Sequence, residues 1–144
     1  MEHPRVRSTS HRARSRGERG ASTAELALAM PLLLLVTVGI IDFSRVVSAR
    51  NMLSNAAREA TRYASVRSID SQDPVTLEMV AGEVMDRIGP LDPDLLTINT
   101  SWSPTNAPGG TVQVDLVYNF QPIAPIMPME LLQVTSSSSM IISY

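Results

Sequence analysis

One apolar stretch near the N-terminus constrains this chain more than any other feature. Residues 26–41 contain no charged side chain, and between residues 21 and 43 the only ionisable groups are Glu25 and Asp42, one near each end. A helix of about 20 predominantly apolar residues spans the hydrocarbon core of a bilayer. The sequence therefore predicts a single membrane-spanning helix over residues 21–43.

The residues before this stretch are basic. Residues 1–20 hold six arginines and two glutamates, a net charge of +4, whereas the remaining six arginines and twelve acids give residues 21–144 a charge of −6. A basic tail can bind nucleic acid, but basic residues beside a membrane helix hold their side in the cytoplasm. We expect residues 1–20 to be a disordered cytoplasmic leader, with the C-terminal part outside the membrane and no nucleic acid bound.

A small-residue site lies before the apolar run, whereas a secretory signal is cut after its apolar core. Gly20 gives the backbone freedom that a peptidase needs to cut before Ala21. Glu25 lies one helical turn after Ala21, so its carboxylate can face the freed amine of its own chain or of a neighbour. The alternative is that Glu25 only opposes the helix dipole near a helix N-terminus.

The chain also resembles a known family. Gly20 followed at the fifth place by Glu25, and then an apolar helix, is similar to the type IV prepilin pattern; the rival Gly17 fails because its fifth residue is Ser22. The string RGERGASTAELALAMPLLLLVTVGIIDFSR, followed by AAREATRYA, resembles the TadE-like pseudopilins, and more loosely so do the C-terminal strands. One departure is Leu26, where an aromatic residue is usual. The resemblance implies a minor pilin of the bacterial Flp, or tight-adherence, pilus system, cut by a prepilin peptidase after Gly20.

The helical pattern continues beyond the membrane stretch. Pro31, inside the apolar run, removes one hydrogen bond and predicts a kink. Over residues 44–67 apolar residues recur at spacings of three and four, which predicts an amphipathic helix packed on the head of the protein or on neighbouring subunits. Its apolar stripe consists of Val46, Ala49, Leu53, Ala56, Ala60 and Tyr63.

Residues 68–144 read as a small head. Asp73 and Pro74 predict the start of a short helix that Gly89 and Pro90 end. The sequence LDPD at residues 91–94 fits turn and cap chemistry better than a calcium site, which needs six to eight oxygens. Alternation predicts strands over residues 95–102, 111–120 and 132–144, with SPTNAPGG as a loop at residues 103–110. The expected fold is α+β: a long, partly transmembrane helix, a short helix and a three-stranded antiparallel sheet.

Two surface features of the head allow more than one interpretation. The aromatic residues Trp102, Tyr118 and Tyr144 form either a surface-binding patch or, more in keeping with alternating strands, part of the core. The apolar segment QPIAPIMP at residues 121–128 contains three prolines, which exclude a central strand. It either contacts a partner subunit or packs on its own head.

Composition argues against an enzyme. The chain has no cysteine, and both histidines, His3 and His11, lie in the leader, so the head lacks the commonest acid–base group and metal ligand. We expect no cofactor and no metal. The expected partners are a prepilin peptidase, other pilin subunits, the inner-membrane assembly platform and the lipid bilayer. The competing classes are an unprocessed, signal-anchored assembly factor and a membrane-tethered enzyme.

Overall fold

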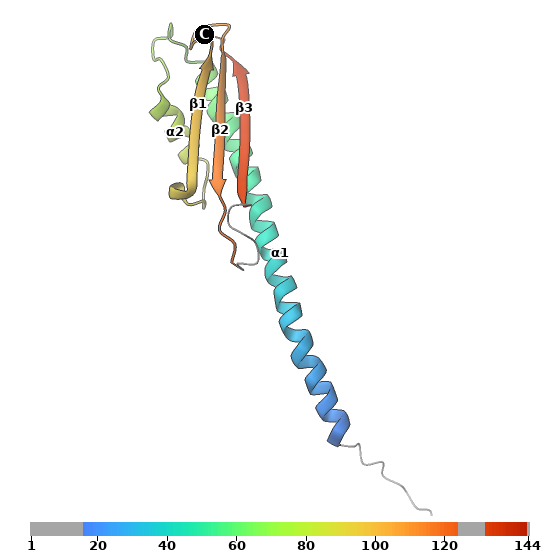
Figure 1. Ribbon diagram of the computed structural model, residues 1–144. Helices are drawn as coiled ribbons and strands as arrows, with labels where there is room; N and C mark the ends of the chain where they lie inside the picture. Colours follow the sequence, from blue (N-terminus) through green and yellow to red (C-terminus); the bar gives the residue numbers. More distant parts are fainter. Residues whose placement is uncertain (1–15, 124–131, 144) are drawn as a thin grey trace, which may run out of the picture. The chain divides into compact units, whose positions relative to one another are not determined.

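The computed structural model describes residues 16–123 and 132–143 (Figure 1). The chain divides into two compact units, Met1–Thr37 and Val38–Tyr144. Its elements are two helices, a short 3-10 turn and three strands, which confirms the predicted α+β class. In order they are α1 (Arg16–Ser65), α2 (Leu77–Met85), η1 (Pro93–Leu95), β1 (Leu96–Ser103), β2 (Thr111–Asn119) and β3 (Gln133–Ile141).

Helix α1 begins earlier than expected. Residues 16–20 are helical, so the prediction that residues 1–20 form a disordered arm is wrong for its last five residues; residues 1–15 lie outside the described part. The apolar run that follows contains no residue that ends a helix, because Pro31 removes only one hydrogen bond. The helix therefore begins about one turn before Gly20 and continues through the apolar run.

The three strands form one antiparallel sheet in the order β1-β2-β3. Val112 in the central strand β2 faces Trp102 of β1 and Met140 of β3, and at the other end Tyr118 faces Leu96 and Val134. The alternation predicted for β2 is confirmed, since Val112, Val114, Leu116 and Tyr118 are buried. Full burial of such a side chain is worth about 1.5–3 kcal/mol relative to exposure.

Helix α1 supplies the other half of the core. Its C-terminal half runs beside β3, while α2 lies against β1 (Figure 1). The predicted apolar stripe is confirmed, and the structure adds four buried residues that the stripe omitted: Ala57, Thr61, Ala64 and Ser65. The Thr61 hydroxyl donates to its own helix at Ala57 O, 2.6 Å, and lies 3.3 Å from Ser138 O of β3. Small side chains on both elements thus allow the helix and the strand to approach closely.

The start of α2 differs from the expected one. Thr76, not Asp73, is the N-cap: its backbone is extended and its hydroxyl accepts from Met79 N at 3.3 Å. Pro74 lies before the helix rather than in its first turn. The reason is tertiary, because Val75 is buried and its N–H donates to Arg67 O at 3.3 Å. That contact keeps residues 74–76 out of the helix, which begins at Leu77.

The turns follow the sequence closely. Asp92 caps η1 by accepting from Asp94 N at 3.0 Å, which confirms the turn interpretation of LDPD. The loop between β1 and β2 ends in Gly109 and Gly110, and each position requires glycine for a different structural reason. Gly109 has φ +84°, and a Cβ on Gly110 would lie 2.5 Å from Thr105 O, so only glycine fits both positions.

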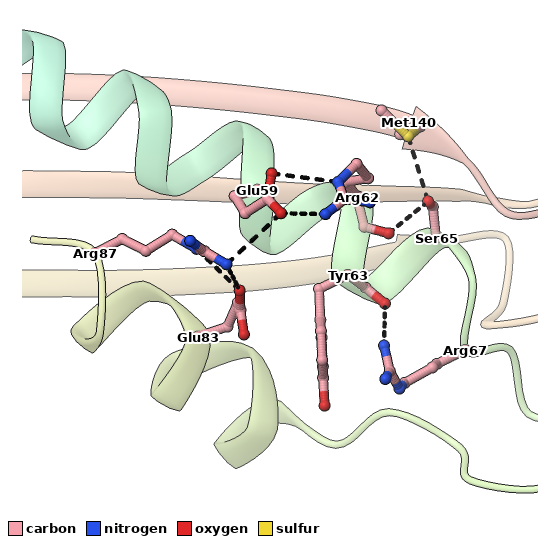
Figure 2. Close-up of polar contacts among 8 residues, drawn as sticks. All are labelled: Glu59, Arg62, Tyr63, Ser65, Arg67, Glu83, Arg87 and Met140. Carbon is pink, nitrogen blue, oxygen red and sulfur yellow. Dashed lines mark hydrogen bonds and ion pairs between the residues drawn. The ribbon is translucent and has the colours of Figure 1, made fainter.

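Two smaller expectations have mixed outcomes. Tyr118 is buried and Trp102 is partly buried against the core, which confirms the core interpretation for both; Tyr144 lies outside the described residues. Just after β3, Ile142 is buried, whereas Met140 within β3 is 41% exposed. Its Sδ lies 3.3 Å from Ser65 Oγ at the rim of the core (Figure 2).

Candidate processing and assembly segment

The predicted processing site lies inside α1. Gly20 and Ala21 both have helical backbone and are exposed, and a Cβ on Gly20 would meet nothing within 4 Å. The site is therefore accessible but not extended. A peptidase would have to open the first turns of the helix before it could cut here.

Glu25 is exposed on the same helix, four residues after Ala21. Residues at this spacing lie on one face of a helix, so the two predicted participants are neighbours along it. Among the side chains that the structure describes, none is hydrogen-bonded or ion-paired to Glu25. Ala21 and Glu25 are thus neighbours on one face of α1, and the pairing role of Glu25 stays a prediction.

The apolar run presents its side chains outward. Leu28 is 80% exposed and Leu33 is 67% exposed, and the part of α1 from Gly20 onward is long and apolar enough to cross a membrane, with none of its most apolar window buried. Pro31 lies within the helix. A shallow apolar groove on this helix is lined by Leu26, Ala29, Met30, Leu32, Leu33 and Val36. The kink itself stays a prediction.

Two hydroxyl groups near the C-terminal end of this run are satisfied within the helix. Thr37 donates to Leu33 O, and Ser44 donates to Ile40 O, each at 2.8 Å. Such bonds to the preceding turn leave no hydroxyl without a partner where water is scarce. This local pattern is compatible with a lipid environment.

Just beyond the run, an ion pair within α1 is hydrogen-bonded to the segment that follows β2. The Asp42 carboxylate accepts from Ile123 N, 3.0 Å from each oxygen, and from Arg45 Nη1 at 3.1 Å. Arg45 also donates to Gln121 O at 3.3 Å, and its guanidinium lies over the Phe120 ring, 5.0 Å from the centroid. We call Asp42, Arg45 and the 120–123 segment the base clamp.

The base clamp was missed by the sequence reasoning, which treated Asp42 only as the end of the apolar run. Opposite charges three residues apart were the available signal. Nothing in the sequence locates their partners, because Gln121 and Ile123 are about 80 residues away and past a strand end. The rest of the apolar segment, residues 124–128, lies outside the described residues, so neither its contact with a partner subunit nor its packing on the head is tested.

A second polar network joins α1 to α2 (Figure 2). Arg62 donates to Glu59 at 3.2 Å through Nε and by a second bond through Nη2. Arg87 binds Glu83, with Nε 2.9 Å from Oε1, and also lies 3.6 Å from Glu59 Oε1. The hydrogen bond from Arg62 lowers the pKa of Glu59 below its ordinary value. All four charges are compensated, so this network is structural.

Comparison with known proteins supports the resemblance. Residues 20–62 match the model of the TadE-like protein family. The matched stretch lies wholly within α1, includes Gly20, Ala21, Glu25 and Pro31, and does not extend to the C-terminal strands. Neither a curated protein nor a solved structure matches the chain significantly. Residues 20–62 are therefore similar to the TadE-like family, and this similarity suggests a pilus-associated membrane protein.

Proposed function

We propose that this chain is a minor pilin or pseudopilin of a Flp-type, tight-adherence pilus. It is inserted in the cytoplasmic membrane with residues 1–20 in the cytoplasm and the head outside. A prepilin peptidase cuts it between Gly20 and Ala21, and the mature chain contributes to pilus biogenesis or structure together with other pilin subunits and the assembly platform. The carrying observation is Glu25 at the fifth place after Gly20, exposed on an apolar helix that matches the TadE-like model.

Cutting the Gly20–Ala21 bond requires the helix to open locally. Four residues of α1 precede Gly20, so the opening involves little more than the first turn, and terminal turns fray at low cost. Glycine weakens a helix by about 1 kcal/mol relative to alanine. Gly20 therefore lowers the free energy needed to open the helix at this bond.

Cleavage changes the electrostatics of the new N-terminus. It removes the basic leader and leaves an ammonium at Ala21, one turn from Glu25. A lone carboxylate at bilayer depth costs up to a few kcal/mol, and an amine from the same chain or from a neighbour offsets this cost. Pairing between chains would couple processing to subunit assembly.

The helical backbone at Gly20–Ala21 favours a second candidate. In this alternative the chain is not cut, stays anchored by its leader and apolar helix, and acts as a stationary assembly factor of the same machinery. The two candidates differ in a single covalent property, the mass of the chain in cells.

Intact-mass measurement of the chain purified from its own cells tests the proposal. We expect a mature protein that begins at Ala21, and we expect Gly20→Ala to retain the leader. Gly39→Ala is the matched control, because Gly39 is also helical with nothing within 4 Å of an added Cβ, and it should be processed normally. A full-length mass in wild-type cells would rule out the pseudopilin and support the stationary factor.

A further inference from the structure

Exposed apolar side chains continue past the charged end of the membrane stretch. Ile40, Phe43 and Val47 are 62%, 71% and 42% exposed, and their spacings of three and four place them on one face of α1. In the segment that follows β2, Ile123 is 60% exposed. An apolar surface of this kind marks contact with a protein or a membrane.

The base clamp fixes Ile123 at the level of α1 where the apolar run ends. Both Asp42 carboxylate oxygens lie 3.0 Å from Ile123 N, and Phe43 is the next residue of the helix. Two large exposed apolar side chains, one from α1 and one from the segment after β2, are thereby held at the same position along the axis of α1. Neither belongs to the core of the head.

The charges at this level are neutralised internally. Asp42 is only 14% exposed and is paired with Arg45, whose guanidinium also contacts Gln121 O and the Phe120 ring. A paired and hydrogen-bonded ion pair loses less on leaving bulk water than two free charges do. Asp42 and Arg45 therefore do not compel this end of the helix to stand clear of lipid.

The length of the apolar run indicates that lipid contacts this apolar surface. The uncharged run, residues 26–41, has 16 residues, so a span of about 20 residues also takes in flanking residues, as the predicted span over residues 21–43 does. A short apolar stretch draws its flanking residues toward the bilayer, and the flanking residues on this side are those of the base clamp. Ile40 and Phe43 thus lie at the end of the apolar run in the sequence of α1.

We propose that Phe43 and Ile123, held by the base clamp, are immersed in the lipid interface and seat the base of the head on the bilayer. The partner is the boundary between lipid head groups and acyl chains, rather than a protein. This inference rests on the membrane insertion that the proposed function includes, but it does not depend on cleavage after Gly20.

Site-directed fluorescence tests this directly, because the chain contains no cysteine. Full-length single-cysteine variants Phe43→Cys and Ile123→Cys are labelled with an environment-sensitive nitrobenzoxadiazole and reconstituted in phosphatidylcholine–phosphatidylglycerol vesicles. Quenching by a nitroxide on the acyl chains is compared with quenching by aqueous iodide.

Two matched labels calibrate the result. Ile141→Cys carries the label at an isoleucine with similar exposure, 65%, at the opposite end of the sheet, since Ile141 pairs with Thr111 at the start of β2. Leu33→Cys marks the apolar run itself. We expect the labels at positions 43 and 123 to be quenched by lipid nitroxide at least about twofold more than the label at 141, and to be shielded from iodide.

Each other outcome is decisive. Strong iodide quenching at 123 with lipid quenching at 33 would overturn the inference while leaving membrane insertion intact. Loss of lipid quenching at 33 would overturn insertion as well. Shielding at 123 from both quenchers would show that a second copy or another protein covers the surface. Asp42→Ala, which removes the acceptor for Ile123 N, should increase iodide quenching at 123 and leave the label at 33 unchanged.

Discussion

Glu25 is the residue on which the proposed assembly role depends. It is exposed on α1 one turn after Ala21, and it is the only charged residue between Gly20 and Asp42. A carboxylate in such an apolar stretch is costly and marks a functional position. Its value to the protein should therefore appear in assembly and not in folding.

Substitution of Glu25 by alanine separates these roles. We expect Glu25→Ala to leave membrane insertion, head stability and leader removal unchanged, while lowering the amount of assembled pilus by at least about tenfold, as the loss of a charge pair worth about 1.4 kcal/mol or more would do. Pilus protein sheared from cells measures assembly, and membrane fractionation measures insertion. Glu25→Asp, which keeps the charge, is the partial control. Normal pili with Glu25→Ala would show that the carboxylate has no such role.

Glu59 belongs to a different class of charged residue. The hydrogen bond from Arg62 lowers its pKa in the folded chain, so the pair stabilises the fold at pH values above the ordinary glutamate pKa. That stabilisation is lost as the pH falls through the lowered, folded-state pKa. Because the pair is at the surface, the effect is small.

The expected result for Glu59→Gln is a decrease of a few degrees at most in Tm at pH 7, which shrinks toward zero as the medium is acidified below the ordinary glutamate pKa. Circular dichroism of the full chain in detergent measures the Tm across pH. Asp73→Asn, an exposed carboxylate away from this network, should show little difference at any pH. A Glu59→Gln deficit that grows on acidification would contradict the assigned pairing.

At the scale of elements, α2 shows how tertiary contacts set a helix boundary. Asp73 and Pro74 have the residue types of a helix start, yet the cap is Thr76. Burial of Val75 and its bond to Arg67 O hold the preceding residues extended. The local preference for a helix start at Asp73 is worth a fraction of a kcal/mol. The burial of the Val75 side chain outweighs it.

Alanine substitution distinguishes the two candidate caps. Thr76→Ala should destabilise the head by about 1 kcal/mol and increase hydrogen exchange at the first amides of α2, where the hydroxyl accepts from Met79 N. Asp73→Ala should change the stability by less than about 0.5 kcal/mol. Equal effects of the two substitutions would show that the helix also uses the earlier start.

At the scale of the whole molecule, the core belongs to one of the two units. Within the described residues, every member of the buried cluster lies between Leu53 and Ile142, whereas the apolar residues of the first unit are exposed. A unit with its own core can fold alone. We therefore expect the membrane stretch to anchor the head and to contribute little to the free energy of unfolding of the head.

Deletion of residues 1–37 tests this division. We expect the remaining chain, in the same detergent, to unfold cooperatively with a Tm within about 5 °C of the full chain, a shift on the order of 1 kcal/mol. In that shortened chain, Leu53→Ala should lower the free energy of unfolding by about 2–5 kcal/mol, since Leu53 is fully buried. A broad, noncooperative transition without the substitution would show that the head needs the first unit.

The sequence alone determined the features that depend on local pattern. The apolar run, the amphipathic stripe, the alternation in β2 and the glycine-rich loop each repeat with the period of one element, so the α+β class and the Gly20–Glu25 spacing could be read directly. The family match over residues 20–62 lies within this readable part.

Only the tertiary structure decided which distant groups meet. Asp42 accepts a hydrogen bond from Ile123, about 80 residues away, and Val75 delays α2 by packing in the core. Thr61 is buried in the core, where its hydroxyl lies 3.3 Å from Ser138 O. None of these contacts leaves a period in the sequence. They depend on how the sheet packs on the helix, and burial and hydrogen bonding across that interface outweigh the local preferences of each residue.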